Sequence, residues 1–130
     1  MPIELNHTIV QSRDKHAAAR FVGELLGLEV GAPFGPFVPL VTDNGVTLDY
    51  ATSDRSDIPP QHYAFLVSEK DFDQIFGRIQ EAGVTYYPSP ALDRPGEINH
   101  RDGGRGAYFR DLDGHVLEII TRPYGSGPAS

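Results

Sequence analysis

The chain has 130 residues, 39% of them hydrophobic, which is enough for one domain with an ordinary core and too short for a second domain. Its 11 Lys and Arg residues are outnumbered by 18 Asp and Glu residues, and the net charge of −7 disfavours nucleic acid and anionic membranes as partners. The absence of cysteine excludes disulfides, thiolate metal sites and cysteine nucleophiles, so any metal must bind to imidazole and carboxylate groups.

The apolar runs in the sequence are only a few residues long. They fall well short of the roughly 20 residues that a membrane-spanning helix needs. The first residues, MPIELNH, lack the basic-then-apolar pattern of a secretion signal. We therefore expect a cytoplasmic protein.

The first half of the chain begins with a short β-prone run, LNHTIVQ at residues 5–11, which leads into a helical pattern. We expect this helix to begin near Ser12 and to end at Gly27, which can adopt the left-handed conformation. The half closes on the phrase GVTLDY at residues 45–50. Apolar residues at helical spacing form the stripe that would face the core: Ala18, Phe21, Val22, Leu25 and Leu26.

The second half repeats this plan. It begins with the β-prone run QHYAFLV at residues 61–67, and Ser68 with Asp71 three residues later resembles a capping box that starts a helix. The helix should end at Gly83, and the half closes on GHVLEI at residues 114–119. The matching apolar stripe consists of Phe72, Ile75, Phe76 and Ile79.

The shared order predicts an α+β domain of two βαβββ modules with eight strands, at about residues 3–55 and 60–122. The second half is the longer one, and its extra residues fall in the proline- and glycine-rich stretch 88–106, which we expect to form a loop or lid. We expect residues 123–130 to form a flexible tail outside the fold.

Three polar residues on the predicted strands are candidate metal ligands. Alternate strand residues share a face, so His7, His62 and Glu118 each project among apolar neighbours. If those faces line one cavity, two imidazoles and a carboxylate converge on a divalent metal and leave coordination positions open for substrate. Taken singly, each residue is more typical of a surface or hydrogen-bonded core position. The equivalent placement of the two histidines in the two halves favours the metal site.

The segments LNHTIV, HYAFLV and GRGAYFRDLDGHVLEIIT resemble the vicinal oxygen chelate superfamily, over about residues 3–122. This superfamily includes glyoxalase I, extradiol ring-cleaving dioxygenases, fosfomycin-resistance enzymes, methylmalonyl-CoA epimerase and bleomycin-resistance proteins. The resemblance implies mixed sheets curved around a central cavity. It also implies one divalent metal ion (Fe, Mn, Zn, Ni or Co) held by His7, His62 and Glu118.

The same resemblance implies an enzyme that acts on a small molecule chelating the metal through vicinal oxygens, with lyase, isomerase or ring-cleaving dioxygenase chemistry. Many members build their sites across a two-fold interface, so a homodimer is expected, in which His7 and His62 of one site can come from different chains. The alternative is a metal-free small-molecule-binding or antibiotic-resistance protein of the bleomycin-resistance type, whose members typically lack this ligand set.

Individual activities of the superfamily imply further site residues. Glyoxalase I has a fourth ligand near the position of Asp49, which here could be a weak ligand, a general base or a solvated strand residue. Similarity to the extradiol enzymes makes Tyr108 a hydrogen-bond partner of substrate and His100 an acid or base. Ordinary strand packing for Tyr108 and a lid position for His100 remain as alternatives.

Fosfomycin-resistance enzymes are similar in the C-terminal phrase as well. They usually have a small polar residue two positions after the first histidine, whereas this chain has Ile9, which disfavours that activity. Arginines in and near the 88–106 loop could attract an anionic substrate, although such residues are more often solvated charges; they are Arg101, Arg105 and Arg110.

Overall fold

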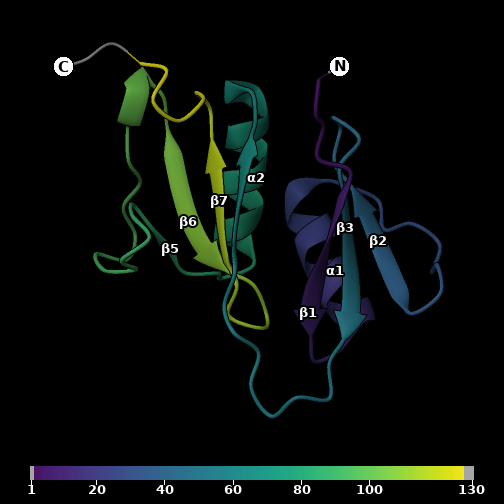
Figure 1. Ribbon diagram of the computed structural model, residues 1–130. Coiled ribbons are helices and arrows are strands. Elements are labelled where there is room, and N and C mark those ends of the chain that lie inside the picture. The colour runs from purple at the N-terminus through teal and green to yellow at the C-terminus, as the bar shows by residue number, and fades with distance from the viewer. Residues whose placement is uncertain (1, 128–130) are drawn as a thin grey trace. The chain divides into compact units, whose positions relative to one another are not determined.

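The computed structural model describes residues 2–127, and the chain divides into two compact units between Pro59 and Pro60 (Figure 1). Each unit contains one helix and one open sheet with two edge strands. The predicted α+β class, with one strand–helix–strands module in each half, is confirmed. Within the described residues no helix has the length and apolar content needed to cross a membrane.

The first unit has a three-stranded mixed sheet in the order β1-β3-β2, with β1 parallel and β2 antiparallel to the central strand β3. The expected fourth strand is reduced to a single bridge between Val30 and Leu40. Proline and glycine residues follow Val30, and Pro33 has no N–H to donate to a ladder, which explains why pairing does not continue. The elements are β1 (His7–Ser12), α1 (Lys15–Leu26), β2 (Phe37–Val41) and β3 (Thr47–Thr52).

Helix α1 begins later than the sequence predicts. Asp14 is the N-cap, and its carboxylate accepts hydrogen bonds from the backbone N–H groups of His16 and Ala17. Ser12 instead ends β1, where its hydroxyl donates to the Ala51 carbonyl at 2.9 Å, so the prediction of a start near Ser12 is wrong. The predicted end at Gly27 is confirmed, with φ of 76° at that residue.

The second unit has a four-stranded mixed sheet in the order β4-β7-β6-β5. Strand β4 runs parallel to β7, whereas β6 is antiparallel to both β7 and β5. Ser68 caps the helix as predicted, because its hydroxyl accepts the backbone N–H of Asp71 at 3.0 Å. The elements are β4 (His62–Leu66), α2 (Glu69–Glu81), β5 (Tyr86–Tyr87), a short 3-10 turn η1 (Arg101–Gly103), β6 (Gly106–Arg110) and β7 (Val116–Ile120).

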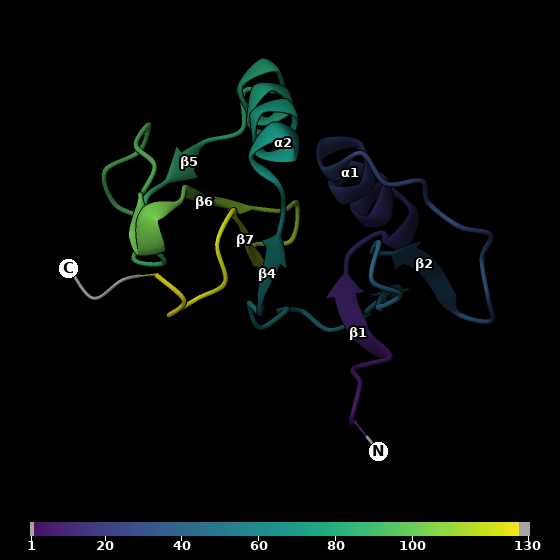
Figure 2. The same ribbon diagram turned by 90° about the horizontal axis from the view of Figure 1, so that it is seen from above.

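In each unit the helix lies along one face of its sheet, as the view from above shows (Figure 2). The residues predicted to line the helix stripes supply much of the core: Val22 and Leu25 in the first unit, and Phe72, Ile75 and Ile79 in the second, are all buried. Strand side chains on the helix side are buried too. The opposite face of each sheet is more exposed and carries polar side chains together with apolar ones such as Ile9 and Leu66.

The stretch 88–106 forms a loop between β5 and β6, as the sequence predicts. Asn99 anchors it, because its backbone N–H and carbonyl both pair with Gly106 at 2.9 Å and its side-chain amide donates to the Pro88 carbonyl. Residues 123–127, which the sequence assigns to a flexible tail, are attached to this loop. Their backbone N–H groups at Gly125 and Gly127 donate to Asp102, whereas residues 128–130 lie outside the described residues.

Candidate functional site

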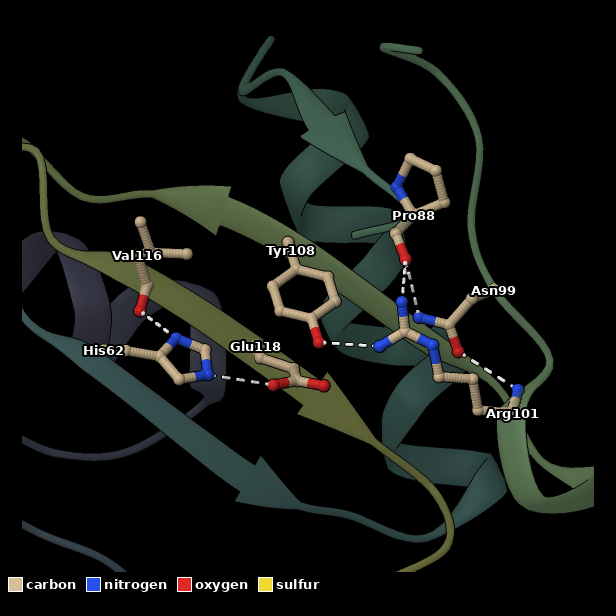
Figure 3. A network of polar contacts seen from close by, with 7 residues as sticks. All are labelled: His62, Pro88, Asn99, Arg101, Tyr108, Val116 and Glu118. Atoms are coloured by element: carbon tan, nitrogen blue, oxygen red, sulfur yellow. Dashed lines mark hydrogen bonds and ion pairs between the residues drawn. The ribbon is translucent and has the colours of Figure 1, made fainter. Parts of the chain in front are cut away.

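The second unit brings three of the predicted site residues together on the face of its sheet opposite α2 (Figure 3). Glu118 is at the centre of β7, where it is in register with Ala64 of β4 on one side and with Tyr108 of β6 on the other. Residues in register across neighbouring strands project from the same face. His62 is two residues before Ala64 and therefore shares this face. The sheet thus positions an imidazole, a carboxylate and a phenol side by side.

The His62 ring makes two contacts that fix its chemistry. Its Nδ1 is 3.0 Å from the Val116 carbonyl oxygen, and its Nε2 is 3.0 Å from Oε1 of Glu118. A carbonyl oxygen can only accept, so Nδ1 carries a proton and donates it. In the neutral ring Nε2 then has a free lone pair that faces a carboxylate oxygen. Two electron-rich atoms this close need either a proton shared between them or a bound cation.

Glu118 is buried, with only 7% of its surface exposed, whereas the side chain of His62 is about half exposed at 47%. A buried carboxylate without a compensating charge is unfavourable. The exposed side of the imidazole leaves an approach from solvent. The pair therefore has the features of a cation site open on one side.

Tyr108 lies directly beside this pair. Its ring stacks on the His62 imidazole at a centroid distance of 5.8 Å, and its hydroxyl accepts a hydrogen bond from Nη1 of Arg101 at 2.9 Å. Burial raises the pKa of the Tyr108 phenol, and its hydrogen bond to the Glu118 carboxylate raises that pKa further, whereas Arg101 lowers it. The hydroxyl is held between an acceptor and a cationic donor.

The contact of Arg101 with Tyr108 was not predicted from the sequence. The loop holds it in place, because the Asn99 side chain accepts its backbone N–H at 3.1 Å and its guanidinium also reaches the Pro88 carbonyl at 3.5 Å (Figure 3). The only sequence signal was a cluster of arginines in and near the loop. The distance in space between these arginines and Tyr108 depends on the loop conformation, which the sequence does not determine.

His100, the predicted acid or base, is exposed at the start of the η1 turn. The described residues give it no hydrogen bond, ion pair or ring contact, with Tyr108 or with any other side chain. Of the other arginines, Arg105 pairs with Glu69 and Asp73 at 2.8 and 2.9 Å. The Arg110 guanidinium lies over the Tyr87 ring, 5.8 Å from its centroid.

The remaining predicted residues, His7 and Asp49, belong to the first unit. His7 on β1 is exposed, and its Nδ1 is 2.7 Å from the side-chain oxygen of Asn6. Asp49 on β3 is half-buried and in register with Ile9. Because His7 and Ile9 alternate with buried residues of β1, His7 and Asp49 share the sheet face opposite α1. Each unit therefore presents its candidate residues on the face that its helix leaves open.

Residues 2–127 of the single chain contain no group of three or more His, Cys, Asp or Glu residues placed to hold a metal ion. The second unit supplies two donors of the predicted set, His62 and Glu118, in mutual contact.

The family model for the Glyoxalase/Bleomycin resistance protein/Dioxygenase superfamily matches residues 4–119. The chain belongs to this superfamily, which confirms the resemblance seen in its sequence.

Two solved structures are similar over nearly the whole chain. "Oxidase ChaP-H2" is 65% identical with a TM-score of 0.95, and the match covers 98% of this chain and 100% of that structure's chain. "Oxidase ChaP-H1" is 54% identical with a TM-score of 0.92, over 95% of this chain and 99% of its own. A third relative, "Glutathione transferase FosA" of Serratia marcescens, is 35% identical over 121 residues, which is 88% of this chain and 78% of that protein.

Proposed function

We propose that the protein is a divalent-metal-dependent enzyme that oxidises a small molecule bearing vicinal oxygens, with O2 as the oxidant. The main support is the contact between Nε2 of His62 and Oε1 of Glu118 at 3.0 Å. The other nitrogen of the ring already donates to a backbone carbonyl, as in the histidines that bind metals in proteins. A cation between the two atoms would compensate the buried carboxylate.

The donor set fits a divalent metal ion. Two donors bonded to one ion at about 2.1 Å and at right angles to each other are about 3.0 Å apart, and His62 and Glu118 have this separation. We propose His7 as the third donor, which gives the two-histidine, one-carboxylate set that leaves coordination positions open. When bound, the ion would polarise the vicinal oxygens of a chelating substrate and, as Fe, Mn or Co, could exchange electrons with it.

The groups beside these donors would act on the substrate. A phenol is protonated at neutral pH. Once Glu118 binds the ion, the Tyr108 hydroxyl would be free to donate its hydrogen bond to a substrate oxygen that carries developing negative charge. Arg101 would strengthen that donor, because its guanidinium already donates to the same hydroxyl oxygen. Roles for Asp49 and His100 stay predictions, because the described residues assign neither of them a contact within the site.

Oxidation is the reaction favoured among those of the superfamily. The two solved structures that match nearly the whole chain are both titled oxidases and are 65% and 54% identical, whereas the relative named as a glutathione transferase is 35% identical. Ile9, two positions after His7, also departs from the small polar residue usual in fosfomycin-resistance enzymes. These observations favour transfer of oxygen or electrons over addition of a thiol.

We further propose that the protein works as a homodimer in which His7 of one chain can complete the site of another. The predicted ligand set spans both units of the chain, and isologous two-fold pairing is the commonest way for small proteins to share a site. The substrate is a small molecule in either case.

Metal content and oxygen uptake test the proposal. Protein purified without chelator should contain close to one divalent ion per chain by elemental analysis, and it should consume O2 when catechol is supplied as a vicinal diol. Glu118→Ala should show neither property, and Glu81→Ala on the exposed end of α2 should show both. Consumption of glutathione without O2 uptake would contradict oxidation. Protein that binds no divalent ion after reconstitution would contradict metal dependence and favour metal-free small-molecule binding.

A further inference from the structure

Next to Glu118 the second unit has a small hollow lined by several arginine side chains. Arg101, Arg105 and Arg122 line it, which places three of the chain's 11 Lys and Arg residues at one spot in a protein of net charge −7. Glu118 forms part of the same wall. Glu118 therefore belongs both to the wall of the hollow and to the proposed metal site.

Arg105 is already neutralised by its own unit. Its Nε and Nη1 atoms pair with Glu69 at 2.8 Å and with Asp73 at 2.9 Å, and its guanidinium lies 4.4 Å from the centroid of the Phe72 ring. These contacts fasten the start of β6 to α2. An arginine with two carboxylate partners has little capacity left for a ligand.

Arg122 differs from Arg105 both in where its side chain lies and in having no carboxylate partner in the described chain. Its stem lies across Gly104, where an added Cβ would be 2.6 Å from Cγ of Arg122. The φ of Gly104 is −116°, an ordinary value for any residue, so glycine is needed there for space and not for conformation. The exposed guanidinium has no hydrogen bond or ion pair with residues 2–127. It is a positioned cation without a protein partner in the described chain.

Asp102 holds the segment that follows Arg122 against the loop. Its two carboxylate oxygens accept the backbone N–H groups of Gly125 and Gly127, each at 3.1 Å. Gly127 lies so close that an added Cβ would be 2.2 Å from Cα of Asp102. Asp102 is the other acid in the wall of the hollow. Both of its oxygens accept backbone N–H groups, and within residues 2–127 it forms no ion pair with Arg122.

We propose that this hollow binds a carboxylate of the substrate, held by the guanidinium of Arg122 with Arg101 beside it. The inference rests on the proposed function and adds a substrate class to it: a vicinal-oxygen chelator that also bears an acidic group. Two guanidinium groups next to a divalent cation outweigh Glu118 and Asp102 in charge, so the complete site would attract an anion. A carboxylate can accept two parallel N–H donors from one arginine, which gives it orientation as well as affinity.

A matched set of ligands isolates the acidic group. Catechol, 2,3-dihydroxybenzoate and 3,4-dihydroxybenzoate have the same vicinal diol, and the last two add a carboxylate at different positions. Titration calorimetry on the metal-loaded protein should show at least one of the two acids binding more tightly than catechol by on the order of 10- to 100-fold. Arg122→Ala should remove this preference while catechol affinity and metal content stay unchanged, and Arg122→Lys should retain part of it.

Arg20→Ala, on an exposed position of α1, changes the net charge by the same amount and should keep the full preference. Equal affinity of the wild-type protein for catechol and both acids would overturn the inference while metal dependence stands. An equal loss of acid and catechol binding in Arg122→Ala would overturn it too, because a specific carboxylate contact predicts a selective loss. A wild-type protein that binds no metal would overturn the proposed function itself, and the metal assay detects that case separately.

Discussion

Tyr108 and Glu118 are in direct register across the antiparallel strands β6 and β7, although ten positions and a tight turn separate them in the chain. The turn at residues 111–114 closes with Gly114 at φ of 86° and preserves the alternation of the two strands. A shift of one residue in this register would move the phenol to the helix side of the sheet. The pairing therefore places the hydroxyl on the same face as the His62 imidazole.

Removal of that hydroxyl should affect turnover and leave the metal in place. We expect Tyr108→Phe to lower oxygen uptake on the order of 10²-fold, because the variant loses a hydrogen bond to charge that develops on substrate. Metal content should match that of the wild-type protein. Tyr87→Phe on the neighbouring strand β5 is the control, since it removes a hydroxyl from a half-buried tyrosine in register with Tyr108. Wild-type turnover in Tyr108→Phe would show that the tyrosine serves only in packing.

Loss of the carboxylate should affect the metal itself. Glu118→Ala should weaken divalent-ion binding by more than about 100-fold, because the remaining imidazoles are neutral and provide no compensating charge. Glu118→Gln keeps the shape and one carbonyl acceptor, so its affinity should lie between those of Glu118→Ala and the wild-type protein. Direct titration of chelator-treated protein with Mn²⁺ or Zn²⁺ measures all three. Equal affinities in the series would place the metal elsewhere.

A mixing experiment tests whether His7 completes the site of a second chain. His7→Ala and Glu118→Ala should each fail to bind metal when purified alone. If sites are shared across a dimer, random pairing after unfolding and refolding the two variants together makes half the dimers mixed, each with one complete site. The mixture should then regain about a quarter of the wild-type metal binding.

Failure to regain any binding, together with a monomer by sedimentation, would show that each site is built within one chain. A dimer that regains no binding would mean that the chains associate without sharing ligands.

The buried Asp111 should give stability a dependence on pH. Burial raises the pKa of its carboxyl above the usual value, and one carboxylate oxygen is buried without a hydrogen-bond partner in the described residues. The folded chain therefore binds this proton more tightly than the unfolded chain. The resulting stabilisation is present below the unfolded pKa and is lost as the pH rises through the folded pKa.

Asp111→Asn cannot titrate, yet its amide oxygen can still accept the backbone N–H groups of Asp113 and His115 that Oδ1 accepts now. Urea midpoints measured from pH 4 to pH 7 should therefore lack this fall in Asp111→Asn. Asp57→Asn, at an exposed position, should keep the wild-type profile. Parallel profiles for the wild-type protein and Asp111→Asn would mean that Asp111 does not titrate differently on folding.

The ends of helices could largely be predicted from the sequence. Ser68 and Gly27 mark helix ends because a capping hydroxyl and a left-handed glycine act within a few residues, and the structure has them where they are expected. The first helix shows the limit of this reasoning. Ser12 and Asp14 are both suitable caps, and the bond from Ser12 to Ala51 on a distant strand decided in favour of Asp14.

The candidate site also has some features that follow from local sequence and others that depend on distant contacts. Strand alternation is a local property, so the sequence alone determined that His62 and Glu118 project from strand faces, each among its neighbours. Their contact at 3.0 Å and the pairing of Glu118 with Tyr108 depend on strand order and register, which hydrogen bonds between distant segments set.

In the 88–106 loop, adjacent residues have no fixed relative direction. The bonds of Asn99 to Pro88 and Gly106 fix the loop so that Arg101 contacts Tyr108 and His100 is exposed. Only the tertiary structure could decide that choice, because the energy that orders a loop comes from contacts far away in the chain.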